Sequence, residues 1–157
     1  MKEAPLNIQQ ASPEMLNDIF SLLSVVNLPH EGVADYLGDF LVATDDAGMM
    51  IGCIGLERHA KIGLLRSLAV HPDYQGNRIG SRLTSALLAI AEREGLTEIV
   101  LLTTTARDFF ARVFGFREAD RSSYESALRN SPEWNLPRCS SAVLMQLSLE
   151  NKGLPGT

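Results

Sequence analysis

The chain has 157 residues, of which 45% are hydrophobic and 21% are charged, as is typical of one globular domain with a sizeable core. A formal net charge of −5, without any run of Lys or Arg, argues against nucleic acid as a partner. No stretch is long and apolar enough to span a bilayer, and the first residues lack the apolar core of a signal peptide. We therefore expect a cytoplasmic protein with one domain over residues 1–157, a core over about 6–149 and a frayed tail over 150–157.

The cysteines and histidines give no sign of a metal site. Cys53 and Cys139 are too few for a disulfide framework, and their spacing matches no metal motif. The three histidines lie far apart and do not pair at helical spacing. The sequence therefore predicts no bound metal, and Cys53 is expected to be a small core residue.

The first half of the chain predicts a strand, two helices and three further strands. A hydroxyl residue followed by Pro at Ser12-Pro13 is typical of a capped helix start. Apolar residues at helical spacing extend that helix to about Asn27, and Asp45–Gly48 has the composition of a turn. The expected elements are a strand at 6–9, helices at 13–27 and 32–37, and strands at 40–44, 50–57 and 64–70.

The second half begins with the clearest helix, Gly80–Glu94, for which Gly95 is a fitting C-terminal stop. Thr105–Asp108 resembles a capping box ahead of a later helix that should end at Gly115. The remaining expected elements are strands at 99–103, 116–117 and 141–149, with weak helical character at 122–130. Hairpins followed by a β-α-β unit predict a mixed α/β sheet and not a regular doubly wound one.

A strand, a loop with glycines and a helix start follow one another between Val70 and Gly80. The first amides of a helix lack intrahelical acceptors, and the helix dipole adds partial positive charge there. A phosphate or pyrophosphate can bind these amides, and glycine lets the backbone approach it closely. The loop matches neither G-x-x-x-x-G-K-[ST] nor G-x-G-x-x-G, which disfavours nucleotide sites of those two kinds.

The spacing Gln75-x-x-Arg78-x-Gly80 resembles the pyrophosphate loop of the GNAT superfamily of N-acetyltransferases, [Gln/Arg]-x-x-Gly-x-[Gly/Ala]. Arg78 replaces the middle glycine, where a positive φ suits glycine better, although its charge is available to a phosphate. Leu65–Pro72 and Phe109–Phe116 also resemble that superfamily, so the resemblance covers roughly residues 6–149. It implies an α/β fold with a mixed, mostly antiparallel central sheet and flanking helices.

The resemblance implies acetyl-CoA as the co-substrate and transfer of its acetyl group to a small amine. The phosphates are expected on the loop and the first helical turn, and the pantetheine arm along the backbone of the preceding strand. A homodimer is a candidate assembly, because dimers are common in the superfamily. The implied cofactor-binding residues are Leu68, Ala69, Val70, Gln75, Gly76, Asn77, Arg78, Ile79, Gly80, Ser81 and Phe110, the last of which is alternatively a core residue.

Acetyl transfer needs a neutral amine, an oxyanion donor and a proton for the departing thiolate. Glu57, near the end of a strand beside the cofactor strand, is the candidate base, with a structural ion pair to Arg66 as the alternative. Arg66 lies among apolar residues and either grips a substrate carboxylate or neutralises Glu57. Backbone N–H groups near Leu68–Val70 are the candidate oxyanion donors.

Many members of the superfamily carry a Tyr acid on the late helix, where this chain has Phe109 and Phe110. Neither ring can give a proton, so the proton comes from another group or from water, or the thiolate leaves unaided. Tyr124, Ser67 and Cys139 are the candidate donors. The missing Tyr also keeps open a different function, that of a non-catalytic CoA-binding or sensory module.

A narrower resemblance, carried by Gly55-Leu56-Glu57, Leu64–Val70 and Leu101–Ala106, is to the acetyltransferases encoded in bacterial arsenic-resistance clusters. It implies an arsenic-linked context, with an amino acid or an arsenic- or phosphorus-containing analogue as acceptor. The acceptor pocket is expected near 28–36 and 120–140, with Trp134 as its cover or as an interface anchor. Direct arsenic binding through Cys139 is a third hypothesis.

Overall fold

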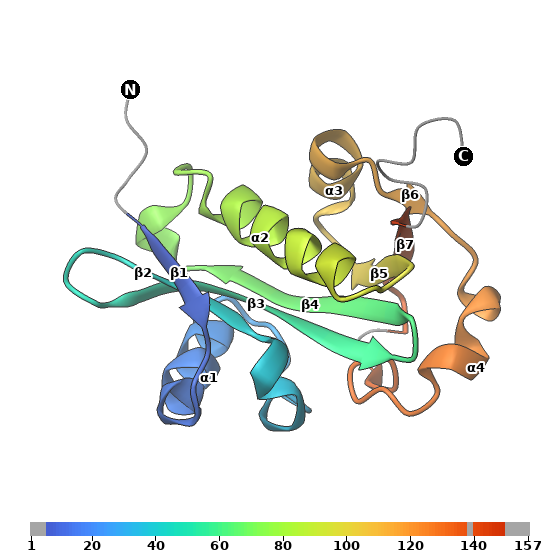
Figure 1. The fold of residues 1–157 in the computed structure, drawn as a ribbon, viewed down its shortest axis with the longest axis horizontal. Helices are drawn as coiled ribbons and strands as arrows, with labels where there is room; N and C mark the ends of the chain where they lie inside the picture. The colour runs from blue at the N-terminus through green and yellow to red at the C-terminus, as the bar shows by residue number, and fades with distance from the viewer. Residues whose placement is uncertain (1–5, 138–139, 150–157) are drawn as a thin grey trace. The chain divides into compact units, whose positions relative to one another are not determined.

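The computed structural model describes residues 6–137 and 140–149. Seven strands form one sheet in the order β1-β2-β3-β4-β5-β7-β6, as Figure 1 shows. The pair β4–β5 is parallel, whereas β1–β2, β2–β3, β5–β7 and β6–β7 are antiparallel. This confirms the predicted mixed α/β sheet with flanking helices. The chain divides into two compact units, one with residues 6–56 and 66–89 and the other with residues 57–65 and 90–149.

In the first unit, α1 and the start of α2 lie on opposite faces of the strands (Figure 1). Cys53 joins a core cluster with Ile19 and Leu23 of α1, while a side chain at Gly52 would meet Leu83 of α2. The elements are β1 (Asn7–Gln10), η1 (Pro13–Met15), α1 (Leu16–Val25), η2 (Ala34–Asp39), β2 (Leu41–Thr44), η3 (Pro72–Tyr74) and α2 (Ile79–Arg93), with parts of β3 (Met50–His59) and β4 (Ile62–Val70).

The second unit is centred on β5, which pairs with β4 from Ile62↔Glu98 onward. Its core cluster contains Leu64, Val100 and Leu128, and Gly115 ends α3 at φ +81°, as predicted. The elements are β5 (Glu98–Thr103), α3 (Arg107–Phe114), β6 (Arg117–Glu118), η4 (Arg121–Ser123), α4 (Glu125–Leu128) and β7 (Val143–Ser148), with the remaining parts of β3, β4 and α2.

Two predicted side-chain caps are wrong. Ser12 is the N-cap residue and Pro13 follows it, as predicted, but the Ser12 hydroxyl makes no hydrogen bond within the described residues, because the tight first turn directs the amide of Met15 to the Ser12 carbonyl instead. Thr105 does not cap α3 either, since the N-cap residue is Ala106. The hydroxyl of Thr103, at the end of β5, accepts from the amides of both Thr105 and Ala106 at 3.3 and 2.9 Å.

Candidate functional site

The loop between β4 and α2 adopts the backbone that the glycine-type motif requires. Gly76 has φ +92° and Arg78 has φ +61°, so both lie in the left-handed region. Such a conformation costs an L-residue about 1–2 kcal/mol relative to the right-handed form. The replacement of glycine by Arg78 therefore leaves the left-handed conformation in place and adds strain to the loop.

The first turn of α2 presents backbone amides toward this loop. The amide of Arg82 bonds the carbonyl of Arg78 at 3.0 Å, so the N–H groups of residues 79–81 precede the first intrahelical acceptor. A Cβ atom on Gly80 would lie only 3.9 Å from Cγ2 of Val70, which places this turn close to the end of β4. The amides and the helix dipole are a favourable environment for an anion, and binding of the pyrophosphate at this turn stays a prediction.

Two of the predicted cofactor residues hold the loop through their side chains. Nε2 of Gln75 donates to the carbonyl of Val70 at 3.3 Å, and Nδ2 of Asn77 donates to the carbonyl of Tyr74 at 3.2 Å. The Gln75 bond joins the loop to the end of β4, and the Asn77 bond holds the loop internally. Contact between these side chains and the cofactor stays a prediction.

Strand β4 is distorted just before the segment expected to bind pantetheine. Ser67 has φ +62°, although it is not glycine and is buried. Its carbonyl accepts a hydrogen bond from Sγ of Cys53 at 3.3 Å, and its hydroxyl accepts from Nε of Arg66 at 3.0 Å. Strained backbone of this kind gathers at functional sites. The positive φ of Ser67 could not be predicted from the sequence, because serine does not favour this conformation.

The buried guanidinium of Arg66 supports the loop that follows α1. Nη2 of Arg66 donates to the carbonyl of Pro29 at 3.4 Å. This loop belongs to the region expected to form the acceptor pocket, and it borders a cavity of 380 Å³. The cavity is lined by Phe20, Ser24, Asn27, Leu28 and His30. A role for Arg66 toward a substrate carboxylate stays a prediction.

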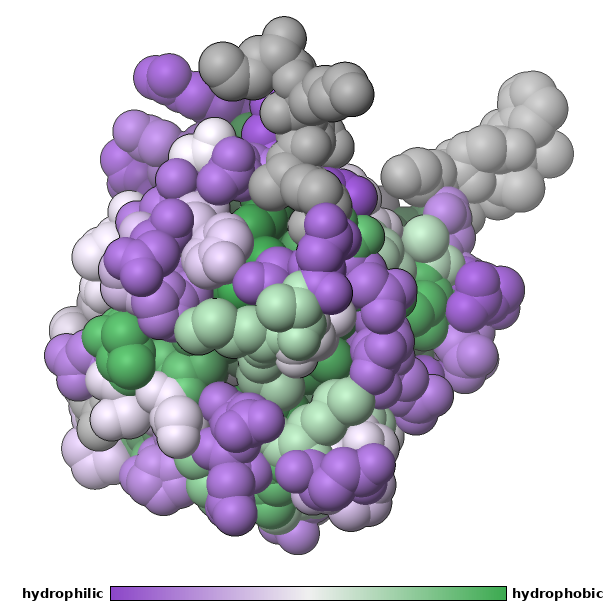
Figure 2. Space-filling view, turned by 90° about the vertical axis from the view of Figure 1, so that its left-hand side faces the viewer, coloured by the Kyte–Doolittle hydropathy of each residue, from purple (hydrophilic) through white to green (hydrophobic). Residues whose placement is uncertain are grey.

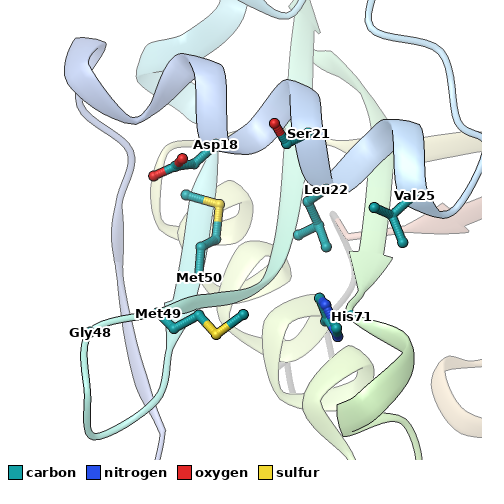
Figure 3. A pocket seen from close by; sticks show the side chains of 8 residues that line it. All are labelled: Asp18, Ser21, Leu22, Val25, Gly48, Met49, Met50 and His71. Carbon is teal, nitrogen blue, oxygen red and sulfur yellow. The ribbon is translucent and has the colours of Figure 1, made fainter.

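A second cavity of the first unit, of 330 Å³, reaches the start of the β4–α2 loop (Figure 3). Val25 and Met49 are exposed at its rim, and apolar surface is visible among polar side chains on this side of the molecule in Figure 2. His71 lines it and accepts a 3.1 Å hydrogen bond from the amide of Asp73 through Nδ1. The complete lining is Asp18, Ser21, Leu22, Val25, Gly48, Met49, Met50 and His71.

In the second unit, Glu57 is completely buried and belongs to a polar cluster. Its Oε1 accepts a 2.5 Å hydrogen bond from Oγ of Ser131 and lies 2.9 Å from Nε2 of His59. Neither contact was predicted from the sequence. The contact with His59 could have been predicted, since residues two apart in a strand share a face. No sequence pattern indicates the contact with Ser131, which lies far along the chain. An ion pair between Glu57 and Arg66 stays a prediction.

Tyr124, the candidate acid, donates a 2.6 Å hydrogen bond to Oε1 of Glu98. Burial and then the Glu98 carboxylate raise the pKa of Tyr124 well above its ordinary value. Nε2 of Gln146 donates to the same oxygen at 3.1 Å. Tyr124 therefore keeps its proton at neutral pH, and its role as an acid stays a prediction.

Phe110 lies in an aromatic cluster of the second unit. Its ring makes edge-to-face contacts with Phe109 and Phe116, at centroid distances of 5.0 and 5.5 Å, and it is buried. These contacts give it a core role there. Packing of Phe110 against pantetheine stays a prediction.

Cys139 lies outside the described residues. Within 6–137 and 140–149, no group of His, Cys, Asp or Glu gathers in a way that could hold a metal ion. No helix in this part of the chain has the length and hydropathy needed to cross a membrane.

Comparison with known proteins gives matches over the same strand–loop–helix segment. Residues 37–118 match the acetyltransferase (GNAT) domain family. An uncharacterized N-acetyltransferase of Chlorobaculum tepidum is 32% identical over 95 residues, which cover 60% of this chain and 59% of that protein. An amino-acid acetyltransferase of Neisseria meningitidis is 27% identical over 147 residues, which cover 83% of this chain and 33% of that protein.

A solved structure is similar over nearly the whole chain. N-acetylglutamate synthase from Neisseria gonorrhoeae, complexed with coenzyme A and L-arginine, has a TM-score of 0.78 at 25% identity. The match covers 95% of this chain and 34% of that one, so this chain spans about a third of that protein. The family match over residues 37–118 covers about half of the chain and includes β4, the loop and all of α2, and on that basis the chain belongs to the acetyltransferase (GNAT) domain family.

Proposed function

We propose that this chain is an acetyl-CoA-dependent N-acetyltransferase that acts on a small amine. The observation that carries the proposal is the loop after β4, where left-handed Gly76 and Arg78 lead into the first amides of α2, which precede the first intrahelical acceptor. This arrangement fits the pyrophosphate of coenzyme A. The coenzyme A bound in the N-acetylglutamate synthase structure supports the same ligand here.

The proposed acceptor is an amino acid or an arsenic- or phosphorus-containing analogue of one. The names of two relatives, an amino-acid acetyltransferase and an N-acetylglutamate synthase, support the amino acid. Arg66, which donates to the carbonyl of Pro29, is the candidate partner for the acceptor's carboxylate. The loop that contains Pro29 borders a cavity large enough for a small amine. The resemblance to arsenic-resistance acetyltransferases supports the organoarsenic analogue.

In the proposed reaction, the amine nitrogen attacks the thioester carbonyl carbon, the N–C bond forms and the C–S bond breaks. Glu57 takes the proton that the amine loses. Backbone N–H groups near 68–70, next to the distortion at Ser67, stabilise the oxyanion. The departing thiolate takes its proton either from water or from a protein group, and Tyr124 is the candidate for that group.

CoA release against a panel of amines tests this function, with amino acids and amino-acid-like organoarsenicals in the panel. We expect a saturable rate with at least one of them. Tight acetyl-CoA binding without turnover on any amine would favour a CoA-binding module instead. Glu57→Gln is expected to lower kcat by about 10²–10⁴-fold, and an unaltered pH–rate profile in that variant would exclude Glu57 as the base.

The cytoplasmic location and the homodimer also stand as proposals. The location is inferred from the sequence, and the dimer is inferred from its frequency in the superfamily. Cell fractionation checks the location, and sedimentation of the purified protein checks the dimer, which a monomer at all accessible concentrations would contradict.

A further inference from the structure

Three polar side chains meet in the interior of the second unit. Glu57 and Ser131 have no exposed surface, and the side chain of His59 is 9% exposed. Oγ of Ser131 donates to Oε1 of Glu57 at 2.5 Å, and Nε2 of His59 lies 2.9 Å from the same oxygen. The proposed reaction assigns a task to Glu57 but none to Ser131 or His59.

Both contacts at Glu57 have the lengths of charge-assisted hydrogen bonds. Hydrogen bonds to a charged oxygen are short, about 2.5–2.7 Å from a hydroxyl and about 2.7–2.9 Å from a cationic N–H donor. A carboxylate oxygen accepts, so in this arrangement Nε2 of His59 is the donor to Glu57. A buried carboxyl group needs hydrogen-bond partners, and Ser131 and His59 both supply them.

We propose that His59 and Ser131 are positioning residues for acetyl transfer, which hold Glu57 as a fixed, ionised carboxylate. The inference rests on the proposed function, because that function makes Glu57 the base. In the step concerned, the amine's proton passes to Glu57 while the N–C bond forms and the C–S bond breaks. His59 and Ser131 neither gain nor lose a proton in that step.

Ser131 also joins Glu57 to the segment that follows α4. Its Oγ accepts a 3.0 Å hydrogen bond from the amide of Trp134 while it donates to Glu57. The guanidinium of Arg121 lies 4.6 Å from the centre of the Trp134 ring, and this cation–π contact also holds the segment in place. One hydroxyl therefore holds both the base and the segment expected to border the acceptor pocket.

His59 borders a cavity of 550 Å³ in the second unit. The charged groups that line this cavity besides His59 are Lys61, in the β3–β4 turn, and Glu98 of β5, which Tyr124 holds. The buried carboxylate of the segment after α4 is Glu133. Lys61 and Glu98 therefore share this cavity with His59, and Glu57 contacts its ring directly. The cavity gives solvent access to His59 while Glu57 stays buried.

Paired variants separate positioning from packing. His59→Gln keeps an N–H donor and Ser131→Thr keeps a hydroxyl, whereas His59→Phe and Ser131→Ala remove the donors. Ser126→Ala, at an exposed position of α4, is the matched control. Each protein is compared by thermal unfolding and by CoA release, with kcat and KM measured over about pH 5 to 9.

We expect His59→Phe and Ser131→Ala to lower kcat at neutral pH by about 10-fold or more, with little change in KM for acetyl-CoA. His59→Gln and Ser131→Thr should recover most of the loss. Equal losses in the conserving and disrupting variants would overturn the proposal.

A second measurement needs no turnover. ¹⁵N NMR of the His59 ring should show a protonated Nε2, and Glu57→Gln should change the ¹⁵N chemical shift of that nitrogen, because the substitution replaces its acceptor. An unchanged shift overturns the pairing. A wild type that releases no CoA with any amine overturns the proposed function and this inference with it. An active wild type whose variants all behave like Ser126→Ala overturns this inference alone.

Discussion

Oη of Tyr74 donates a 2.9 Å hydrogen bond to Oδ2 of Asp45, which joins the loop after β4 to the turn between β2 and β3. Oδ1 of Asp45 accepts from the amides of Ala47 and Met49 at 3.0 and 2.9 Å. The carboxylate thus holds the turn with one oxygen and the loop with the other. Because Tyr74 immediately precedes Gln75, this bond fixes the point at which the proposed pyrophosphate loop begins.

Loss of this bond should weaken cofactor binding. Tyr74→Phe and Asp45→Asn are each expected to raise the Kd for acetyl-CoA about 3- to 10-fold. Without the bond the free loop is less ordered, so it loses more conformational entropy when the cofactor binds. Asp46→Asn, at the exposed neighbouring position, should bind like the wild type. Isothermal titration calorimetry measures all three, and a wild-type Kd in Tyr74→Phe would contradict the expectation.

The same bond should be visible as a shifted titration. The hydrogen bond to Asp45 raises the pKa of Tyr74, and bonds from the Met49 amide and then Tyr74 lower the pKa of Asp45. Asp45 therefore stabilises the fold above its ordinary pKa and loses this effect as pH falls through the lowered value. Tyr74 contributes below its ordinary pKa and loses its effect as pH rises through the raised value. In Asp45→Asn the pKa of Tyr74 should fall back toward its ordinary value, as ¹³C NMR of the ring would show, and an unmoved midpoint would refute this.

Arg78→Gly should change stability and cofactor binding in opposite directions. Glycine relieves the left-handed strain at φ +61°, and after its own entropy cost the free energy of unfolding should rise by about 0.5–1 kcal/mol. Loss of the positive charge should raise KM for acetyl-CoA. Arg78→Gln separates the two effects, since it should raise KM without any gain in stability. Urea unfolding and steady-state kinetics provide the measurements, and an unchanged KM in both variants would remove Arg78 from the phosphate site.

Cys53 should be inert toward thiol reagents in the native protein. Burial raises the pKa of its thiol to about 12, so almost no thiolate is present at neutral pH. Labelling with a thiol reagent, followed by mass spectrometry of peptides, should find Cys53 modified only after denaturation. Labelling of Cys53 at equal rates in native and denatured protein would contradict its buried position.

Long, periodic elements could be predicted from the sequence. The helix expected at Gly80–Glu94 is observed as α2, Ile79–Arg93, and the strand expected at Leu64–Val70 lies within β4. Their patterns are local, because each residue's face depends only on its neighbours along the chain. The caps at Ser12 and Thr105 failed because tertiary turn geometry decides which acceptor an amide reaches.

The candidate site could be predicted only where a motif is contiguous. The loop from Gln75 to Gly80 is one segment, so its place ahead of a helix start could be predicted from residue types and spacing, whereas its contact with the cofactor stays a prediction. The contact between Glu57 and Ser131 joins positions far apart in the chain, and the distortion at Ser67 comes from a residue type without preference for it. Single-sequence patterns carry no information on such contacts, since only the folded chain brings the partners together.

Gly55→Ala should destabilise the first unit. A Cβ atom at this position would lie 2.2 Å from Cζ of Phe40, whose ring is fully buried. Overpacking of this kind costs about 1–3 kcal/mol. Gly38→Ala is the matched control, because its Cβ would meet nothing within 4 Å, and it should lose no stability. Urea unfolding compares the two, and equal midpoints would show that the ring moves aside without cost.

The contact between Gly55 and Phe40 also limits how these two positions can evolve. The ring fills the volume that any side chain at position 55 would need, so neither residue can change freely while the other stays as it is. A larger residue at 55 requires a smaller one at 40, and the path between the two solutions crosses either a clash or a cavity. Across the family, these two positions should therefore vary as a pair, with their combined side-chain volume nearly constant.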